Sequence, residues 1–195
     1  MTRKIATPHG PAAVRLERGG GRALLLLGHG AGGGIDAPDL RVVAEAALAL
    51  GFDVGSVLQP YRVAGRRSPA PAHQLDAAWV AVAEALRGDG PLVVGGRSSG
   101  ARVACRTAND LGAAGVLCLA FPLRTPGRPD RPSRQPELDA PDCPVLVVQG
   151  RGDPFGVPRS AAGRREVVRV KGDHGLKADL AAVSAAVGRW LPRVL

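Results

Sequence analysis

Residues 91–107 read PLVVGGRSSGARVACRT, which is a short apolar run, a serine between glycines, and then a segment with helical spacing. Within it, Gly96-Arg97-Ser98-Ser99-Gly100 matches the pattern G-x-S-x-G. In this pattern a buried strand ends in a sharp turn that exposes the serine hydroxyl, and the N-terminus of the following helix favours negative charge. The chain holds 27 glycines, so the motif alone is weak. Because a strand pattern precedes it and a helical pattern follows, we interpret Ser98 as the candidate nucleophile.

The rest of the chain alternates short apolar runs with longer amphipathic ones, a pattern typical of a parallel sheet flanked by helices. The expected strands cover residues 23–27, 52–58, 91–95, 113–121, 144–149 and 166–170. The expected helices run from 38 to 50, with Asp36 as N-cap, from 73 to 86, from 101 to 108 and from 178 to 191. Residues 60–71 are expected to form a loop.

The length of 195 residues predicts a single domain over residues 1–195. No apolar run approaches the roughly 20 residues of a membrane-spanning helix, and the N-terminus lacks the apolar stretch of a signal peptide. We therefore expect a soluble, cytoplasmic protein without a membrane partner. The three cysteines (Cys105, Cys118 and Cys143) lie among apolar neighbours and indicate reduced core residues, with neither a metal site nor a cofactor.

The longest irregular segment is rich in proline and arginine. It spans residues 122–144, and its composition favours an exposed extended loop over a packed subdomain. We expect residues 123–142 to stand where a helical lid would otherwise be inserted. Without a lid, we expect an open, shallow active site that suits small or surface-exposed esters or thioesters.

A serine nucleophile needs a base, and only His174 of the four histidines lies downstream of Ser98. It follows the last expected strand in Lys171-Gly172-Asp173-His174-Gly175, as the order Ser, acid, His requires. The acid should follow the preceding strand, where Gly150-Arg151-Gly152-Asp153 offers a carboxylate in a turn. Asp173 is the alternative acid, but adjacent side chains usually diverge. We predict Asp153.

An oxyanion hole needs two backbone N–H groups. Ser99 follows the nucleophile and offers one, and the stretch His29-Gly30-Ala31-Gly32-Gly33 resembles a His-Gly-x loop, which points to the N–H of Ala31. His29 is then structural. The alternative is a phosphate-binding loop, since residues 28–33 also fit G-x-G-x-x-G, but no acidic residue follows the next strand where a ribose would need one.

The net charge of +9 raises the question of an anionic partner. Of the 26 basic residues only three are lysines, and the 23 arginines are spread along the chain. Aromatic residues make up 3%, too few for stacking on single-stranded nucleic acid, so we expect no nucleic-acid partner. Four residues of the loop after the second strand could instead favour an acidic substrate, or could simply be solvated: Tyr61, Arg62, Arg66 and Arg67.

The blocks LLLLGHGAGGG, GGRSSGARVACR, PVLVVQGRGDPFG and GDHGL resemble the small α/β-hydrolases of the dienelactone-hydrolase-like group. PYRVAGRRSP and AFPLRTPGRP are similar to the narrower family of testis-expressed protein thirty and NSL complex subunit three. The resemblance covers about residues 20–190 and implies the α/β-hydrolase fold. It also implies Ser98, Asp153 and His174 as a triad, with an oxyanion loop around Ala31.

Two departures bear on function. Dienelactone hydrolases use a cysteine where this chain has Ser98, so their substrate is not carried over. Some members of the narrower family are subunits of a chromatin complex. The sequence therefore supports two classes, a serine hydrolase acting on a small-molecule ester or thioester and a catalytically silent interaction module with the same fold.

Overall fold

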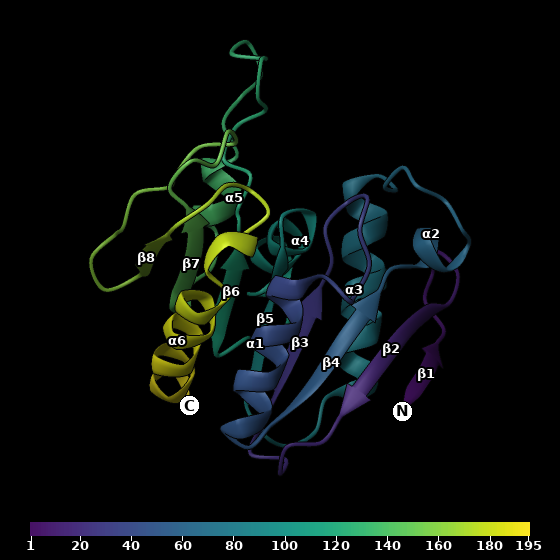
Figure 1. Ribbon diagram of the computed structural model, residues 1–195. Helices are drawn as coiled ribbons and strands as arrows, with labels where there is room; N and C mark the ends of the chain where they lie inside the picture. Colours follow the sequence, from purple (N-terminus) through teal and green to yellow (C-terminus); the bar gives the residue numbers. More distant parts are fainter.

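The central strand β3 (Ala23–Gly28) contains four consecutive leucines and lies between two parallel neighbours, β4 (Phe52–Leu58) and β5 (Leu92–Arg97). Leucines on both faces suit a strand that is covered by helices on both sides. The computed structural model describes all 195 residues, and Figure 1 shows this strand near the middle of the sheet.

The sheet has eight strands in the order β1-β2-β4-β3-β5-β6-β7-β8. Strands β4, β3, β5, β6, β7 and β8 run parallel to one another, whereas β2 pairs antiparallel with both β4 and β1. The remaining strands are β1 (Thr2–Ile5), β2 (Ala12–Glu17), β6 (Gly115–Leu119), β7 (Val145–Gly150) and β8 (Arg165–Val170). The predicted, mostly parallel sheet is confirmed.

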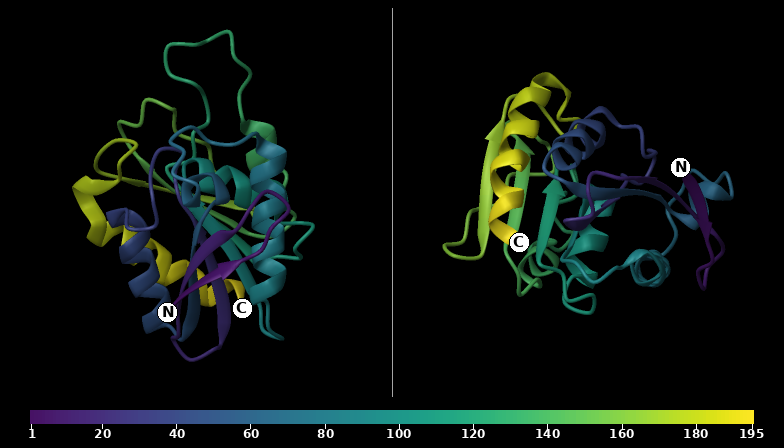
Figure 2. Two further views of the ribbon diagram at one scale, coloured as in Figure 1. Left: turned by 90° about the vertical axis from the view of Figure 1, so that its right-hand side faces the viewer. Right: turned by 90° about the horizontal axis from the view of Figure 1, so that it is seen from below.

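Helices cover both faces of the sheet, as Figures 1 and 2 show. The α-helices are α1 (Pro38–Ala49), α2 (Pro60–Val63), α3 (Ala72–Leu86), α4 (Ser99–Thr107), α5 (Gln135–Asp139) and α6 (Leu180–Trp190). Short 3₁₀ helices cover Lys177–Asp179 and Leu191–Val194. Helices α1 and α6 pack on one face and α3 and α4 on the other, so two apolar clusters form, one on each side of the sheet. No helix has the length and apolar character that crossing a membrane requires.

The antiparallel hairpin of β1 and β2 was not predicted. In β2 the side chains of Ala12 and Val14 are buried and alternate with half-buried neighbours. A polar-apolar alternation over so few residues is a weak signal, and the packing of β2 against β4 decides its conformation.

Two predicted loops contain short helices, and in this respect the prediction was wrong. Within residues 60–71, Pro60 starts α2, because proline fits the first turn of a helix. Within residues 122–144, α5 buries Leu138 and its Glu137 forms ion pairs with Arg102 and Arg106 of α4 at 2.6 and 3.1 Å. The part of this segment before α5 still projects away from the body of the molecule (Figure 1).

The predicted N-cap of α1 was also wrong. Ala37 precedes the helix and no side chain caps it, while Asp36 forms an ion pair with Arg15 of β2 at 2.6 Å. Pro38 at the first position has no N–H that needs a cap, and Arg15 provides a charged partner that is distant in the sequence.

All three cysteines are free thiols. Cys105 and Cys118 are buried with their sulfur atoms 3.5 Å apart, as expected of core residues. Cys143 is half-buried and packs against the edge of the same apolar cluster instead of lying inside it.

Candidate active site

Ser98 lies at the turn between β5 and α4 with a backbone φ of 52°. A left-handed conformation is unfavourable for a residue with a side chain, and it persists here because the surroundings fix the turn. The Ser98 N–H donates to the Leu119 carbonyl at 2.9 Å. A Cβ on either Gly96 or Gly100 would overlap the carbonyl oxygen of Gly28, so both flanking glycines are required by the close approach of β3.

The structure brings together the three residues that the sequence placed after separate strands. His174, in the loop after β8, has its Nε2 atom 2.9 Å from Ser98 Oγ. Its Nδ1 atom is 2.8 Å from Oδ2 of Asp153, which lies in the loop after β7. Nδ1–H therefore donates to the carboxylate, which leaves Nε2 to accept the serine proton. The alternative acid, Asp173, accepts from the Gly175 N–H at 2.8 Å instead.

The Asp153 carboxylate is fully buried and held from both sides. The Phe155 N–H donates to Oδ1 at 2.8 Å, and the side-chain amide of Gln149 donates to Oδ2 at 2.7 Å. The same Gln149 nitrogen lies 3.1 Å from the Phe121 carbonyl and 2.9 Å from the Gly156 carbonyl. These bonds compensate the burial of the carboxylate and fix its direction.

An aromatic ring covers one face of the candidate base. The centroids of the Phe155 and His174 rings are 4.2 Å apart, and the ring planes are inclined by 32°. The imidazole is 19% exposed, so it keeps access to the surface while Phe155 limits its rotation.

The glycine-rich loop after β3 lies beside Ser98, since a Cβ on Gly30 would stand 3.7 Å from that of Ser98. The Ala31 N–H donates to no acceptor. Ser99 is the first residue of α4, so its N–H has no preceding helical carbonyl to bond. Both amides are thus available to an oxyanion. The Tyr61 hydroxyl fixes this loop by donating to the Ala31 carbonyl at 2.7 Å.

His29 links the glycine-rich loop to the end of β4. Nδ1 donates to the Gly30 carbonyl at 2.7 Å, and Nε2 accepts from the Gln59 N–H at 3.1 Å. Burial lowers the pKa of His29, which keeps the ring neutral in the form that these two bonds need. Its position is that of a structural residue.

The four loop residues considered for substrate binding occupy different places. Tyr61 is buried and lines a small cavity together with Ser99. Arg66 lines a neighbouring pocket of about 90 Å³, and Arg62 donates to the Arg66 carbonyl at 3.2 Å. Arg67 is exposed and lines neither of these two pockets. The structure does not bring the three guanidinium groups together at Ser98.

A cleft of about 310 Å³ adjoins the candidate site, although Ser98, Asp153 and His174 are not among the residues that line it. Arg97 and Gly175, the chain neighbours of Ser98 and His174, form one wall, and the start of α1 with Gly33 and Gly34 forms the other. Lys177 also lines this cleft. Glycines and charged side chains thus dominate its surface.

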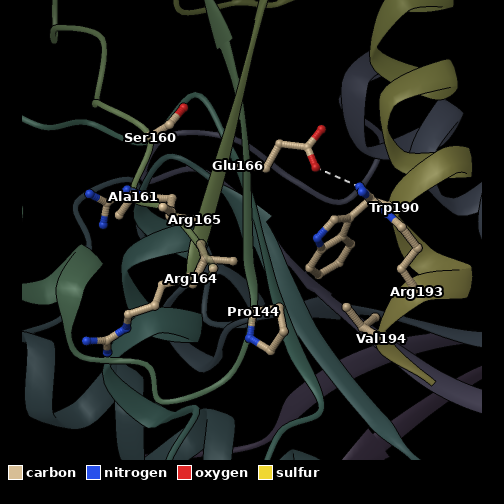
Figure 3. A pocket seen from close by; sticks show the side chains of 12 residues that line it. Pro144, Ser160, Ala161, Arg164, Arg165, Glu166, Trp190, Arg193 and Val194 are labelled. Atoms are coloured by element: carbon tan, nitrogen blue, oxygen red, sulfur yellow. Dashed lines mark hydrogen bonds and ion pairs between the residues drawn. The ribbon is translucent and has the colours of Figure 1, made fainter.

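A larger pocket of about 460 Å³ contains none of the candidate catalytic residues. It lies at the starts of β7 and β8, where Trp190 and Val194 face the segment from Ser160 to Arg165 (Figure 3). Parallel strands present their catalytic loops at their carboxyl ends, so this pocket is at the opposite edge of the sheet. No group of three or more His, Cys, Asp or Glu side chains could hold a metal ion.

Sequence reasoning missed Gln149, Phe155, Arg97 and Asp39 as part of this site. A signal existed for Gln149, which is the only polar side chain in the strand VLVVQG and lies just before the candidate acid. None existed for the pairing of Arg97 with Asp39, because it depends on how α1 packs beside the turn at Ser98.

Comparison with known proteins gives one family match. The model of the family described as alpha/beta hydrolase domain matches residues 21–181. A search of curated proteins finds no match.

Solved structures share the fold over nearly the whole chain. An α/β serine hydrolase without a lid from Xanthomonas campestris has a TM-score of 0.81 and 21% identity, covering 100% of this chain and 94% of its own. An α/β serine hydrolase homologue from Coxiella burnetii has a TM-score of 0.79 and 18% identity, covering 97% and 96%. Est1E from Butyrivibrio proteoclasticus has a TM-score of 0.78 and 16% identity, covering 99% and 98%. At these identities the likeness establishes the arrangement of helices and strands.

Proposed function

We propose that this chain, which belongs to the alpha/beta hydrolase domain family, is a serine hydrolase that cleaves small or exposed carboxylic esters or thioesters through an acyl-enzyme. One observation carries the proposal. A continuous chain of hydrogen bonds joins Asp153 to His174 at 2.8 Å and His174 to Ser98 at 2.9 Å. This is the geometry that activates a serine hydroxyl as a nucleophile.

In the acylation step Ser98 Oγ attacks the carbonyl carbon of the ester or thioester, and its proton passes to His174 Nε2. The carbonyl oxygen becomes negative and accepts hydrogen bonds from the N–H groups of Ala31 and Ser99, each worth roughly 3 kcal/mol in the transition state. The tetrahedral intermediate then collapses. The bond to the leaving group breaks, His174 returns the proton to that group, and the acyl group stays on Ser98.

In the deacylation step water replaces the leaving group. His174 Nε2 takes a proton from the water molecule while the water oxygen attacks the acyl carbon. The second intermediate releases the carboxylic acid as Ser98 Oγ recovers the proton. Asp153 remains ionised throughout, accepts the Nδ1–H bond and stabilises the imidazolium that forms in each step.

The cleft beside Arg97 and Gly175, the chain neighbours of Ser98 and His174, supports a small substrate. Its volume of about 310 Å³ is at the lower end of the range for small-molecule sites, and its lining includes no large apolar side chain that would hold a long acyl chain. Residues 123–142 include the projecting loop and the short α5, and we propose that they stand in place of a lid within one α/β-hydrolase domain formed by residues 1–195.

A chain-length series of p-nitrophenyl esters tests the substrate class. We expect kcat/KM to be highest for acetate or butyrate and to fall for octanoate and palmitate, with the matching short thioester also cleaved. A preference for palmitate would contradict the proposal, because it needs an apolar site that the cleft does not offer.

Three finer points accompany the proposal. We propose that the closest kinship within the family is with the dienelactone-hydrolase-like group and the testis-expressed protein thirty and NSL complex subunit three family, on the basis of residues 60–69 and 120–129. We propose a cytoplasmic location. We also propose a preference for acidic substrates through the loop that bears Arg66.

A further inference from the structure

Arg97 is the residue between Gly96 and the candidate nucleophile, and its guanidinium contacts three separate parts of the site. Nη2 donates to the backbone carbonyl of His174 at 2.8 Å. Nε lies 2.8 Å from Oδ2 of Asp39. Nη1 lies against the glycine-rich loop, since a Cβ on Gly30 would be 3.1 Å from it. One side chain therefore touches the base loop, the oxyanion loop and α1.

Asp39 provides a fixed anchor for this guanidinium. It belongs to the first turn of the twelve-residue helix α1, and its side chain is 1% exposed. Its other oxygen, Oδ1, accepts from the Leu40 N–H at 3.0 Å. Burial raises the pKa of Asp39, and the nearby charge of Arg97 opposes that rise.

The loop that carries His174 is held by backbone bonds on either side of the base, since the Gly172 carbonyl accepts from the Gly152 N–H at 2.9 Å and the Asp173 carbonyl accepts from the Leu176 N–H at 3.2 Å. It contains two residues in left-handed backbone conformations, Gly172 and Leu176, with φ of 112° and 50°. Arg97 is the only donor to the His174 carbonyl. A planar guanidinium with several fixed donors can hold a carboxylate and a carbonyl at once, which a lysine ammonium at the end of a flexible stem cannot match.

Stability alone does not explain this arrangement. Buried ion pairs are weak contributors to stability, because desolvation of both charges offsets their attraction. The contact with His174 gives the pair a more specific role, since Arg97 is covalently next to Ser98. A single side chain thus links the turn that carries the nucleophile to the loop that carries the base.

Resting on the proposed function, we propose that Arg97, anchored by Asp39, is a positioning residue that holds the His174 loop so that Nε2 stays within hydrogen-bonding distance of Ser98 Oγ. Its role is exerted through His174, and it takes no part in proton transfer. A displacement of the base by about 1 Å can reduce a rate by roughly 100-fold.

The test compares Arg97→Ala, Arg97→Lys and Asp39→Asn with the wild type. The readouts are the rate of Ser98 labelling by a small neutral fluorophosphonate, expressed per folded molecule, and the midpoint of thermal unfolding. We expect labelling in Arg97→Ala to slow by about 10-fold to 100-fold. Arg97→Lys and Asp39→Asn should slow it less, because each keeps part of the arrangement.

Chemical rescue separates positioning from a general structural role. The Arg97 side chain is 20% exposed beside the 310 Å³ cleft, so guanidinium ion can enter the space left in Arg97→Ala. Millimolar guanidinium, far below denaturing concentrations, should raise the labelling rate of this variant, whereas sodium at equal ionic strength should not. Arg193→Ala, which removes an ion pair with Glu166 in the distant pocket, is the matched control. It should be labelled at the wild-type rate, and guanidinium should not change that rate.

The outcomes are distinct. Wild-type labelling rates per folded molecule in Arg97→Ala would overturn the inference, and so would slower labelling that guanidinium does not restore. If Arg97→Ala fails to fold, unchanged rates in both Arg97→Lys and Asp39→Asn would overturn it. Absence of labelling in the wild type would instead overturn the proposed function.

Discussion

The side-chain amide of Gln149 donates to Oδ2 of Asp153 at 2.7 Å, and this oxygen is also the one that accepts from His174 at 2.8 Å. Gln149 is the penultimate residue of β7 and is fully buried, so the rigid sheet sets the position of its amide. The carboxylate is therefore oriented by the strand that precedes it, and through the carboxylate the imidazole is oriented as well.

Replacing Gln149 with leucine should weaken catalysis and stability together. The variant removes one bond to Asp153 and leaves the carbonyls of Phe121 and Gly156 with one donor fewer, at a cost of about 1–3 kcal/mol of unfolding free energy. We expect kcat for p-nitrophenyl acetate to fall by about 10-fold, since a loss of roughly 1.4 kcal/mol in the transition state corresponds to that factor. Steady-state kinetics and urea unfolding measure the two effects.

Gln135→Leu is the matched control. It removes an amide-carboxylate bond of 2.8 Å to Asp139 on the exposed surface of α5. Wild-type kcat is expected in this control. A wild-type kcat in Gln149→Leu would contradict the orienting role of that amide.

Asp153→Asn should lower kcat by roughly 10³-fold to 10⁴-fold while the protein remains folded. An asparagine amide in place of Oδ2 would direct a donor at Nδ1–H, which favours the wrong tautomer of His174. Asp173→Asn tests the alternative acid, because asparagine can still accept from the Gly175 N–H. Comparison of kcat in the two variants decides between them, and a large loss in Asp173→Asn with none in Asp153→Asn would reverse the assignment.

Stability should depend on pH through His29. The pKa of His29 is lowered in the folded state. As the pH falls below 6.5, the ordinary pKa of histidine, the unfolded chain therefore binds more protons at this residue than the folded protein does. The stabilising effect of the neutral ring is therefore complete above about pH 6.5 and declines as pH falls below it. Urea unfolding at several pH values should show a smaller decline for His29→Gln than for the wild type.

His73→Gln, which alters an exposed histidine, serves as control and should keep the wild-type slope. If His29→Gln also keeps that slope, another group carries the pH dependence.

Arg66 provides the test of a preference for acidic substrates. Arg66 and Tyr61 line one pocket, and Tyr61 also lines the small cavity that contains Ser99, whereas Arg67 lines neither. We expect Arg66→Ala to lower kcat/KM for a succinylated p-nitrophenyl ester and to leave the acetate unchanged, with Arg67→Ala affecting neither. The proposal would be contradicted if the ratio of kcat/KM for the succinylated ester to that for the acetate were the same in the wild type and in Arg66→Ala.

The sequence predicted most of the sheet and its helices because the deciding signals are local. Apolar strands such as β3 and β7 and the amphipathic pattern of α3 each occur within one segment. The hairpin of β1 and β2, and helices α2 and α5, were missed because they depend on packing against other elements. Glu137, for example, is positioned in α5 by its contacts with α4.

The candidate site was predictable to the extent that it follows strand order. Ser98, Asp153 and His174 each follow the carboxyl end of a parallel strand, and such ends meet at one edge of a sheet. The contacts that hold these three residues in place were harder to predict from the sequence. Gln149 offered a local signal, but the link from Asp39 through Arg97 to the His174 carbonyl exists only once α1 has packed beside the turn.

Covalent labelling tests the central claim most directly. A fluorophosphonate reacts with an activated serine, whose oxygen displaces fluoride and forms a stable phosphonate ester. Mass spectrometry of the folded wild type should show one added phosphonyl group on Ser98, none in Ser98→Ala, and labelling at least about 100-fold slower in His174→Ala, where no base accepts the proton. Folded wild-type protein that remains unlabelled, or is labelled at another serine, would contradict the account and favour a catalytically silent interaction module.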